Sequence, residues 1–103
     1  MKECTYCGLP ATQRDHVVPM AYRASPRHYD TFTVPACREC NMKILRDEPY
    51  FSVFQRTERV LEVLRGWFDE CDWDGGELDP ELAELALRVD FAKNRLRELE
   101  PDY

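Results

Sequence analysis

The sequence predicts a small α+β domain, in which a zinc-stabilised module of two strands and one short helix is followed by an antiparallel two-helix hairpin. Three observations predict this fold: two CxxC pairs in the first half of the chain, short β-branched segments between them, and two later stretches with helical apolar periodicity. The chain has 103 residues, which suits one domain with a marginal core. We expect residues 1–47 to form the module and residues 48–103 the hairpin packed on it.

The paired cysteines predict a structural zinc site. Two cysteines separated by two residues can point both sulfurs at one metal ion, and two such pairs complete a tetrahedral site with zinc–sulfur distances of about 2.3 Å. The expected ligands are Cys4, Cys7, Cys37 and Cys40. Disulfide bonds and simple burial are the alternatives, but the chain does not open with the apolar run of a secretory signal, which favours zinc. Cys71 lies outside the pattern and is expected to be a free thiol.

Between and after the cysteine pairs, the sequence predicts two short strands and a short helix. Asp15-His16-Val17-Val18-Pro19 is expected to be a strand that the proline ends, and Thr31 to Val34 a second strand. The intervening residues 20–31 are polar, basic and interrupted by a proline, as in a loop. Asn41 to Arg46 contains no helix breaker and is expected to be a helix that stops before Pro49.

The second half of the chain predicts two amphipathic helices joined by a turn at Gly75 and Gly76. Ser52 followed by Gln55 fits a capping box that opens the first helix. Asp79 and Pro80 fit the cap and the first position of the second helix. The two apolar stripes are Val53, Phe54, Val60, Leu61, Leu64, Trp67 and Phe68, and then Leu82, Leu85, Ala86, Val89, Ala92, Leu96 and Leu99. We expect the helices to pair antiparallel through these stripes and to cover the zinc module.

The charge of the chain is divided unevenly. Residues 1–47 contain seven basic and five acidic side chains, a net charge of +2, whereas residues 48–103 contain seven and fifteen, a net charge of −8. A nucleic acid would have to bind the first half, while the acidic helices would suit a basic partner protein. No apolar segment approaches the ~20 residues that a bilayer requires, so we expect a cytoplasmic protein without a membrane partner.

Three large aromatic side chains bear on the oligomeric state. Trp67, Phe68 and Trp73 lie near one turn, and they exceed what so small a domain is expected to bury. A symmetric homodimer would cover them. The alternative is a monomer whose helical stripes serve only as core.

Asp15, His16 and Asn41 are candidates for metal-assisted chemistry. The oxygens of an Asp and an Asn suit Mg²⁺, Mn²⁺ or a similar divalent ion, with water and phosphate filling the other positions. A histidine beside such a metal can take a proton from the water that attacks phosphorus. Neighbouring residues on a strand point to opposite faces, so Asp15 and His16 serve one site only if the strand twists or the histidine approaches from the far side of a ligand.

Together these residues resemble the HNH (ββα-metal) nuclease family in its zinc-stapled form. The resemblance runs through Cys4-x-x-Cys7-Gly8, Asp15-His16-Val17-Val18-Pro19 and Val34-Pro35-Ala36-Cys37-Arg38-Glu39-Cys40-Asn41, with Lys43 following, and covers about the first 47 residues. It implies a DNA phosphodiester hydrolase of the kind found in phages and prophages. His16 would be the general base, Asp15 and Asn41 the ligands of the catalytic ion, and the four cysteines the ligands of structural zinc. The basic side chains expected to contact phosphates are Arg23, Arg27, Arg38 and Lys43.

One position departs from the family pattern. The asparagine that orients the histidine loop in the family is replaced by Phe32, whose ring cannot form an amide's hydrogen bonds. Either Asp30, Thr31 or Thr33 substitutes for it, or the site is impaired. Two alternatives to a nuclease follow: a catalytically degenerate scaffold that binds a partner protein through its acidic helices, and a purely structural zinc domain.

Overall fold

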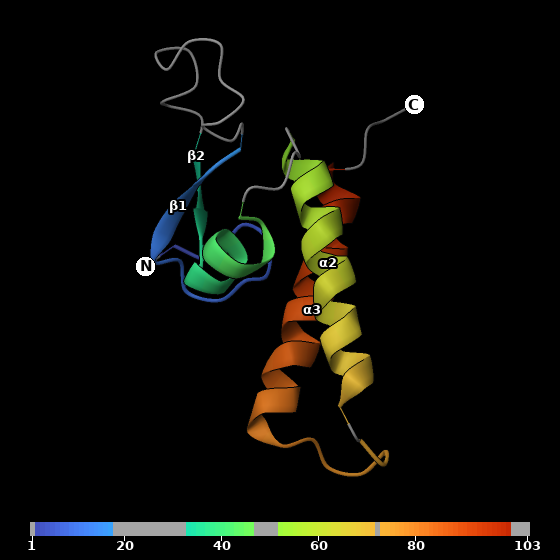
Figure 1. Cartoon of the computed structure of the whole chain (residues 1–103). Helices are drawn as coiled ribbons and strands as arrows, with labels where there is room; N and C mark the ends of the chain where they lie inside the picture. The colour runs from blue at the N-terminus through green and yellow to red at the C-terminus, as the bar shows by residue number, and fades with distance from the viewer. Residues whose placement is uncertain (1, 18–32, 47–51, 72, 100–103) are drawn as a thin grey trace.

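In the part of the chain that the structure describes, two short strands, one short helix and two long helices follow one another (Figure 1). The computed structural model describes residues 2–17, 33–46, 52–71 and 73–99. The elements are β1 (Gln13–His16), β2 (Thr33–Ala36), the π-helix η2 (Glu39–Ile44), α2 (Val53–Glu70) and α3 (Pro80–Leu99). The predicted α+β class and the helical hairpin are confirmed. No helix in the described ranges is both long and apolar enough to cross a membrane.

Within the described ranges, the sheet is one antiparallel pair in which Gln13 lies opposite Ala36 and His16 opposite Thr33. The first strand was predicted at residues 15–19. Asp15 and His16 do lie in it, but the predicted start and the inclusion of Val17 are wrong, because the strand begins at Gln13 and ends at His16. The backbone of Val17 lies in a bend and does not continue the strand, and its apolar side chain is fully buried in the core. Residues 18 and 19, and the expected start of the second strand at Thr31, lie outside the described residues.

The second strand continues through Pro35, which the sheet tolerates because each strand of a two-stranded sheet has an edge without a partner strand. On that edge the Pro35 carbonyl accepts a hydrogen bond from the Thr5 backbone at 2.9 Å. The expected helix at residues 41–46 begins earlier, at Glu39, because Arg38 already has helical backbone angles. The second cysteine pair therefore leads directly from β2 into η2.

The helical hairpin forms with the two predicted caps. The Ser52 hydroxyl accepts a hydrogen bond from the Gln55 backbone at 3.1 Å, and an Asp79 carboxylate oxygen accepts one from the Leu82 backbone at 2.8 Å. Gly75, in the turn, has a φ of 86°. Figure 1 shows α2 and α3 side by side and antiparallel, with their connecting turn at the end away from the sheet.

One core joins the module and the hairpin. The four paired cysteines are buried together with Tyr6, Ile44 and Leu45 of the module and with Val60 and Leu64 of α2. The buried positions of the long helices also include Arg56 on α2 and Arg88 on α3. The apolar stripes did not predict that these two arginines are buried. Arg56 contacts Asp15 of β1, and Arg88 contacts Cys40.

Gly8 lies at the closest approach between the first cysteine pair and α3. Its φ is 83°, and a Cβ atom at this position would lie 2.7 Å from Cδ2 of Phe91. Gly8→Ala is therefore expected to lower the free energy of unfolding by roughly 1–3 kcal/mol, in thermal or urea denaturation. Gly66→Ala is the control: a Cβ there meets nothing within 4 Å, and alanine inside a helix should stabilise by ~0.5–1 kcal/mol. Equal effects of the two substitutions would contradict the packing of α3 on Gly8.

Candidate metal centre and the neighbouring β1 site

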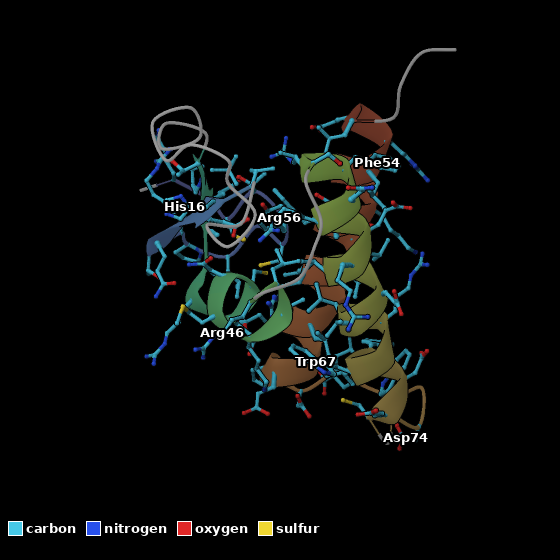
Figure 2. All side chains as sticks on the ribbon, turned by 45° about the horizontal axis from the view of Figure 1, so that its top comes forward. His16, Arg46, Phe54, Arg56, Trp67 and Asp74 are labelled. Carbon is cyan, nitrogen blue, oxygen red and sulfur yellow. The ribbon has the colours of Figure 1, made fainter. Side chains whose placement is uncertain are left out.

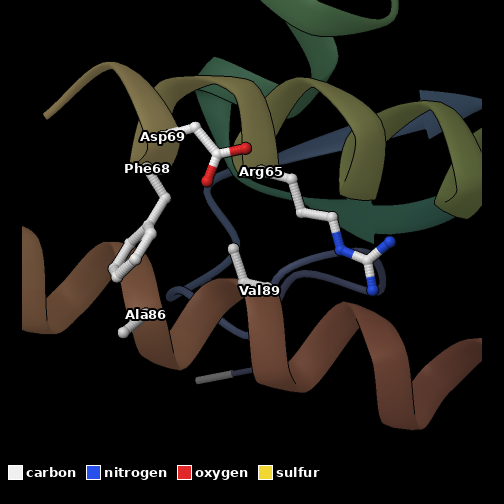
Figure 3. Close-up of a pocket in the computed structure, with 5 residues that line it drawn as sticks. All are labelled: Arg65, Phe68, Asp69, Ala86 and Val89. Atoms are coloured by element: carbon white, nitrogen blue, oxygen red, sulfur yellow. The ribbon is translucent and has the colours of Figure 1, made fainter.

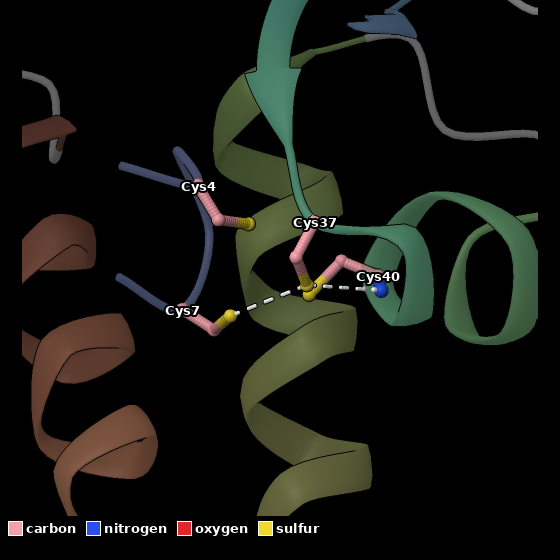
Figure 4. Close-up of side chains that lie close together, drawn as sticks. All are labelled: Cys4, Cys7, Cys37 and Cys40. Carbon is pink, nitrogen blue, oxygen red and sulfur yellow. Dashed lines mark hydrogen bonds between the residues drawn. The ribbon is translucent and has the colours of Figure 1, made fainter. Parts of the chain in front are cut away.

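The four cysteine sulfurs lie within 4.8 Å of one another and are all buried. Figure 4 shows the side chains of Cys4 and Cys7 pointing from the N-terminal turn toward those of Cys37 and Cys40. The Sγ atoms of Cys7 and Cys37 are 3.6 Å apart, close to the ~3.8 Å between sulfurs around a tetrahedral zinc. All five cysteines of the chain are free of disulfides. The cluster could therefore hold a metal ion, and its four thiol donors fit zinc.

Backbone hydrogen bonds shape both turns of the cluster. The Gly8 backbone donates to the Cys4 carbonyl at 3.1 Å, and the Cys40 backbone donates to the Cys37 sulfur at 3.4 Å. Hydrogen bonds from Cys37, Cys40 and Cys7 lower the pKa of Cys4. Hydrogen bonds with Cys37 and Cys4, together with burial, raise the pKa values of Cys7 and Cys40. Four thiolates cannot share this small space alone, and a divalent cation is the chemical partner that would let all four ionise.

Arg88 of α3 reaches this cluster from the second half of the chain. Its Nη1 donates to Glu39 Oε1 at 2.5 Å, and its Nη2 lies 3.9 Å from the Cys40 sulfur. Burial opposes the charged guanidinium, but the negative charge at Cys7 and the hydrogen bond to Glu39 raise the pKa of Arg88. Sequence reasoning missed Arg88. The available signal was its position in phase with Leu85 and Ala92, on the apolar side of the helix.

Asp15 lies on β1 in a buried ion pair with Arg56 of α2. Arg56 Nε and Nη2 donate to Oδ2 and Oδ1 of Asp15, both at 2.7 Å, and each side chain is 3% exposed. The Tyr6 hydroxyl donates to the same Oδ2 at 2.5 Å, and burial with the Asp15 charge raises the pKa of Tyr6. Figure 2 shows Arg56 between α2 and the sheet. Both oxygens of Asp15 are therefore engaged by protein donors.

Asn41 and His16 lie against opposite sides of β1. The Asn41 side-chain amide donates to Gln13 Oε1 at 2.8 Å, and the strand pleat places Gln13 on the same face as Asp15. His16 is half-buried on the other face, opposite Thr33. Its Nδ1 is buried and has no hydrogen-bond partner in the part of the chain that the structure describes. The structure thus brings Asn41 to the Asp15 side of the strand and leaves His16 on the other.

A catalytic divalent ion does not fit Asp15, His16 and Asn41 as they are arranged. Asp15 already accepts from a guanidinium and a phenol, and His16 projects from the opposite face of the strand. Among the described residues, the only group of three or more Cys, His, Asp or Glu side chains with metal-binding geometry is the cysteine cluster. We therefore assign no chemical step to an ion at Asp15.

The basic residues predicted to contact phosphates are only partly within the described ranges. Arg38 and Lys43 lie at or in η2, and both are exposed. The Lys43 ammonium lies 5.1 Å from the centre of the Trp67 ring, which links η2 to α2. Arg23, Arg27 and Phe32 lie outside the described residues.

A small groove between α2 and α3 is a separate feature. Figure 3 shows Phe68 from α2 facing Ala86 and Val89 from α3, with Arg65 and Asp69 at the edges. Its volume is about 130 Å³, below the ~300 Å³ at which ligand pockets usually begin. This groove is therefore smaller than a usual ligand pocket. Comparison with known proteins adds no assignment to the chain, since no family model, curated protein or solved structure matches it.

Proposed function

We propose that this chain is a metal-stapled phosphodiester hydrolase of the HNH (ββα-metal) type that acts on DNA. The observation that carries the proposal is the order of elements around the cysteine cluster: an antiparallel strand pair with His16 on its first strand, followed directly by a helix that carries Asn41. The hydrogen bond from Asn41 to Gln13 ties this helix back to the histidine-bearing strand. The resemblance in residues 1–47 predicts this order.

In this proposal His16 removes a proton from the water that attacks phosphorus. A positioned general base contributes typically 10²–10⁴-fold to a rate. Exposed cations on the module, including Arg38 and Lys43, would contact the DNA backbone. The cysteines would hold zinc as part of the folded framework rather than as a participant in hydrolysis. The resemblance also implies a catalytic Mg²⁺ or Mn²⁺, but Asp15 is paired with Arg56, so no ligand role is assigned to it.

A second candidate is a scaffold of the same fold that binds a basic partner protein. The Asp15–Arg56 ion pair favours it, because this pair removes one of the expected metal ligands from use. The net charge of −8 on residues 48–103 gives such a partner a surface to recognise. The scaffold would bind its partner equally well with or without His16.

Cleavage of supercoiled plasmid by the zinc-loaded protein tests the hydrolase. We expect nicking in at least one of Mg²⁺, Mn²⁺, Co²⁺ and Ni²⁺, and we expect His16→Ala to lower the rate at least ~10²-fold because the general base is lost. His28→Ala is the matched control, since His28 is the other histidine of the chain and lies outside the family motif. Zinc content and circular dichroism must match the parent protein. Absence of cleavage with every ion, or equal cleavage by His16→Ala, would leave the scaffold as the better account.

A further inference from the structure

We propose that Arg88 is a positioning residue of the cysteine metal centre: its guanidinium neutralises part of the thiolate charge and makes retention of the metal depend on the docking of α3. The Nη2 group faces the Cys40 sulfur at 3.9 Å, while Nη1 is held by Glu39 Oε1 at 2.5 Å. Arg88 is 6% exposed. The inference concerns the metal centre alone and does not depend on whether the chain hydrolyses DNA.

The charge of a loaded cluster supplies the reason for a buried arginine. Four thiolates around a divalent cation leave two excess negative charges, and an uncompensated buried charge is costly. Arg88 is the described cation that contacts a cluster sulfur. Its Nε is also buried and has no hydrogen-bond partner within residues 2–17, 33–46, 52–71 and 73–99. Burying a guanidinium with one donor unused is unfavourable, so its attraction to the sulfurs must offset that cost.

Glu39 fixes the direction of the guanidinium. It belongs to η2, immediately before Cys40, so the ion pair joins α3 to the element that carries a metal ligand. The Glu39 side chain is 38% exposed, and an ion pair at this depth contributes only modestly by itself. Its effect is therefore geometric: it holds one edge of the guanidinium and leaves another edge for the Cys40 sulfur.

Two further contacts place α3 along the first cysteine pair. The ring of Phe91 lies against Gly8, directly after Cys7. One turn later, Arg95 Nε donates to the Thr5 carbonyl at 3.1 Å. Arg88, Phe91 and Arg95 recur at steps of three and four residues, so one helical face contacts both halves of the metal module. Detaching α3 would remove these contacts and expose the sulfurs to water and competing chelators.

Zinc release and cobalt spectroscopy together test the role of Arg88. Arg88→Met removes the charge at similar length, Arg88→Lys keeps it, and Arg97→Met is an exposed control on the same helix. With a chromophoric chelator in excess, we expect Arg88→Met to release zinc ~10–100-fold faster, as is typical when a residue supporting a metal ligand is lost. The rate of zinc release from Arg88→Lys should fall between the rates of Arg88→Met and the parent protein. The rate from Arg97→Met should match that of the parent protein.

The cobalt-substituted proteins supply a readout that a purely structural role would not move. Loss of a cation beside sulfur raises the energy of the sulfur electrons, so the thiolate-to-cobalt absorption band should move to longer wavelength in Arg88→Met. An unmoved band, release within twofold of the parent protein, or equal acceleration in Arg97→Met would overturn the proposal. If Arg88→Met does not fold, Glu39→Gln decides: faster release with a shifted band supports the role, and parent values for both overturn it.

Discussion

Removing the metal from the cysteine cluster is expected to unfold the N-terminal module and to detach the helical hairpin from it. Structural zinc contributes an apparent binding free energy of ~10–16 kcal/mol in zinc-finger peptides, whereas a whole domain is stable by only ~5–15 kcal/mol. The cysteine side chains are part of the same buried cluster as Tyr6, Val60 and Leu64. Without the metal, this core would bury four cysteine side chains but would lose the metal–sulfur bonds that join them.

Circular dichroism and thermal denaturation before and after chelation measure this effect. The expected result is loss of the cooperative transition after chelation and its recovery when Zn²⁺ is added back. Cys40→Ser should give the same loss in zinc-containing buffer, because the remaining three ligands do not close the site. Cys71→Ser is the matched control, since Cys71 is exposed and lies outside the cluster. An unchanged melting curve for protein that elemental analysis shows to be metal-free would contradict a structural metal.

The helices were predictable from sequence because their signals are local. Ser52 and Asp79 precede their helices at the cap position, and both accept the predicted backbone hydrogen bonds. The CxxC spacing predicted a cysteine cluster, because two residues between cysteines limit where their sulfurs can point. The first strand was misplaced because Val17 has high β-propensity but is used as core at a bend. Propensity does not distinguish these two uses.

The partners of the two buried arginines could not be predicted because they are distant in sequence. Arg56 pairs with Asp15 across 41 positions, and Arg88 reaches Cys40 across 48. A helical periodicity count treats a cation as solvent-facing, so it assigns such positions to the surface. The same distance explains why the motif around Asp15 suggested an open metal ligand. The motif contains His16 and Pro19 but carries no information about a side chain from α2.

Replacing Arg56 with methionine is expected to lower the free energy of unfolding by about 3–5 kcal/mol, because it leaves the Asp15 carboxylate buried without its cation. For a domain of this size, each kcal/mol corresponds to roughly 4–8 °C in Tm. The expected fall in Tm is therefore at least ~12 °C. Glu62→Gln is the control: its carboxylate pairs with Arg59 at 3.3 Å but is 73% exposed, so the loss should stay below about 1 kcal/mol.

A double-mutant cycle measures how much the ion pair itself contributes to the free energy of unfolding. It separates this contribution from the destabilisation caused by leaving one charge buried without a partner. Asp15→Leu with Arg56→Met removes both charges, and we expect it to recover most of the stability lost in Arg56→Met. If Arg56→Met alone costs less than about 1 kcal/mol, the ion pair does not hold Asp15 in the core. Calorimetric titration of folded Arg56→Met with Mn²⁺ extends the test to function. New binding that Asp15→Asn abolishes would mean that Arg56 occupies the place of a divalent cation, and that the hydrolase and the scaffold differ by one side chain.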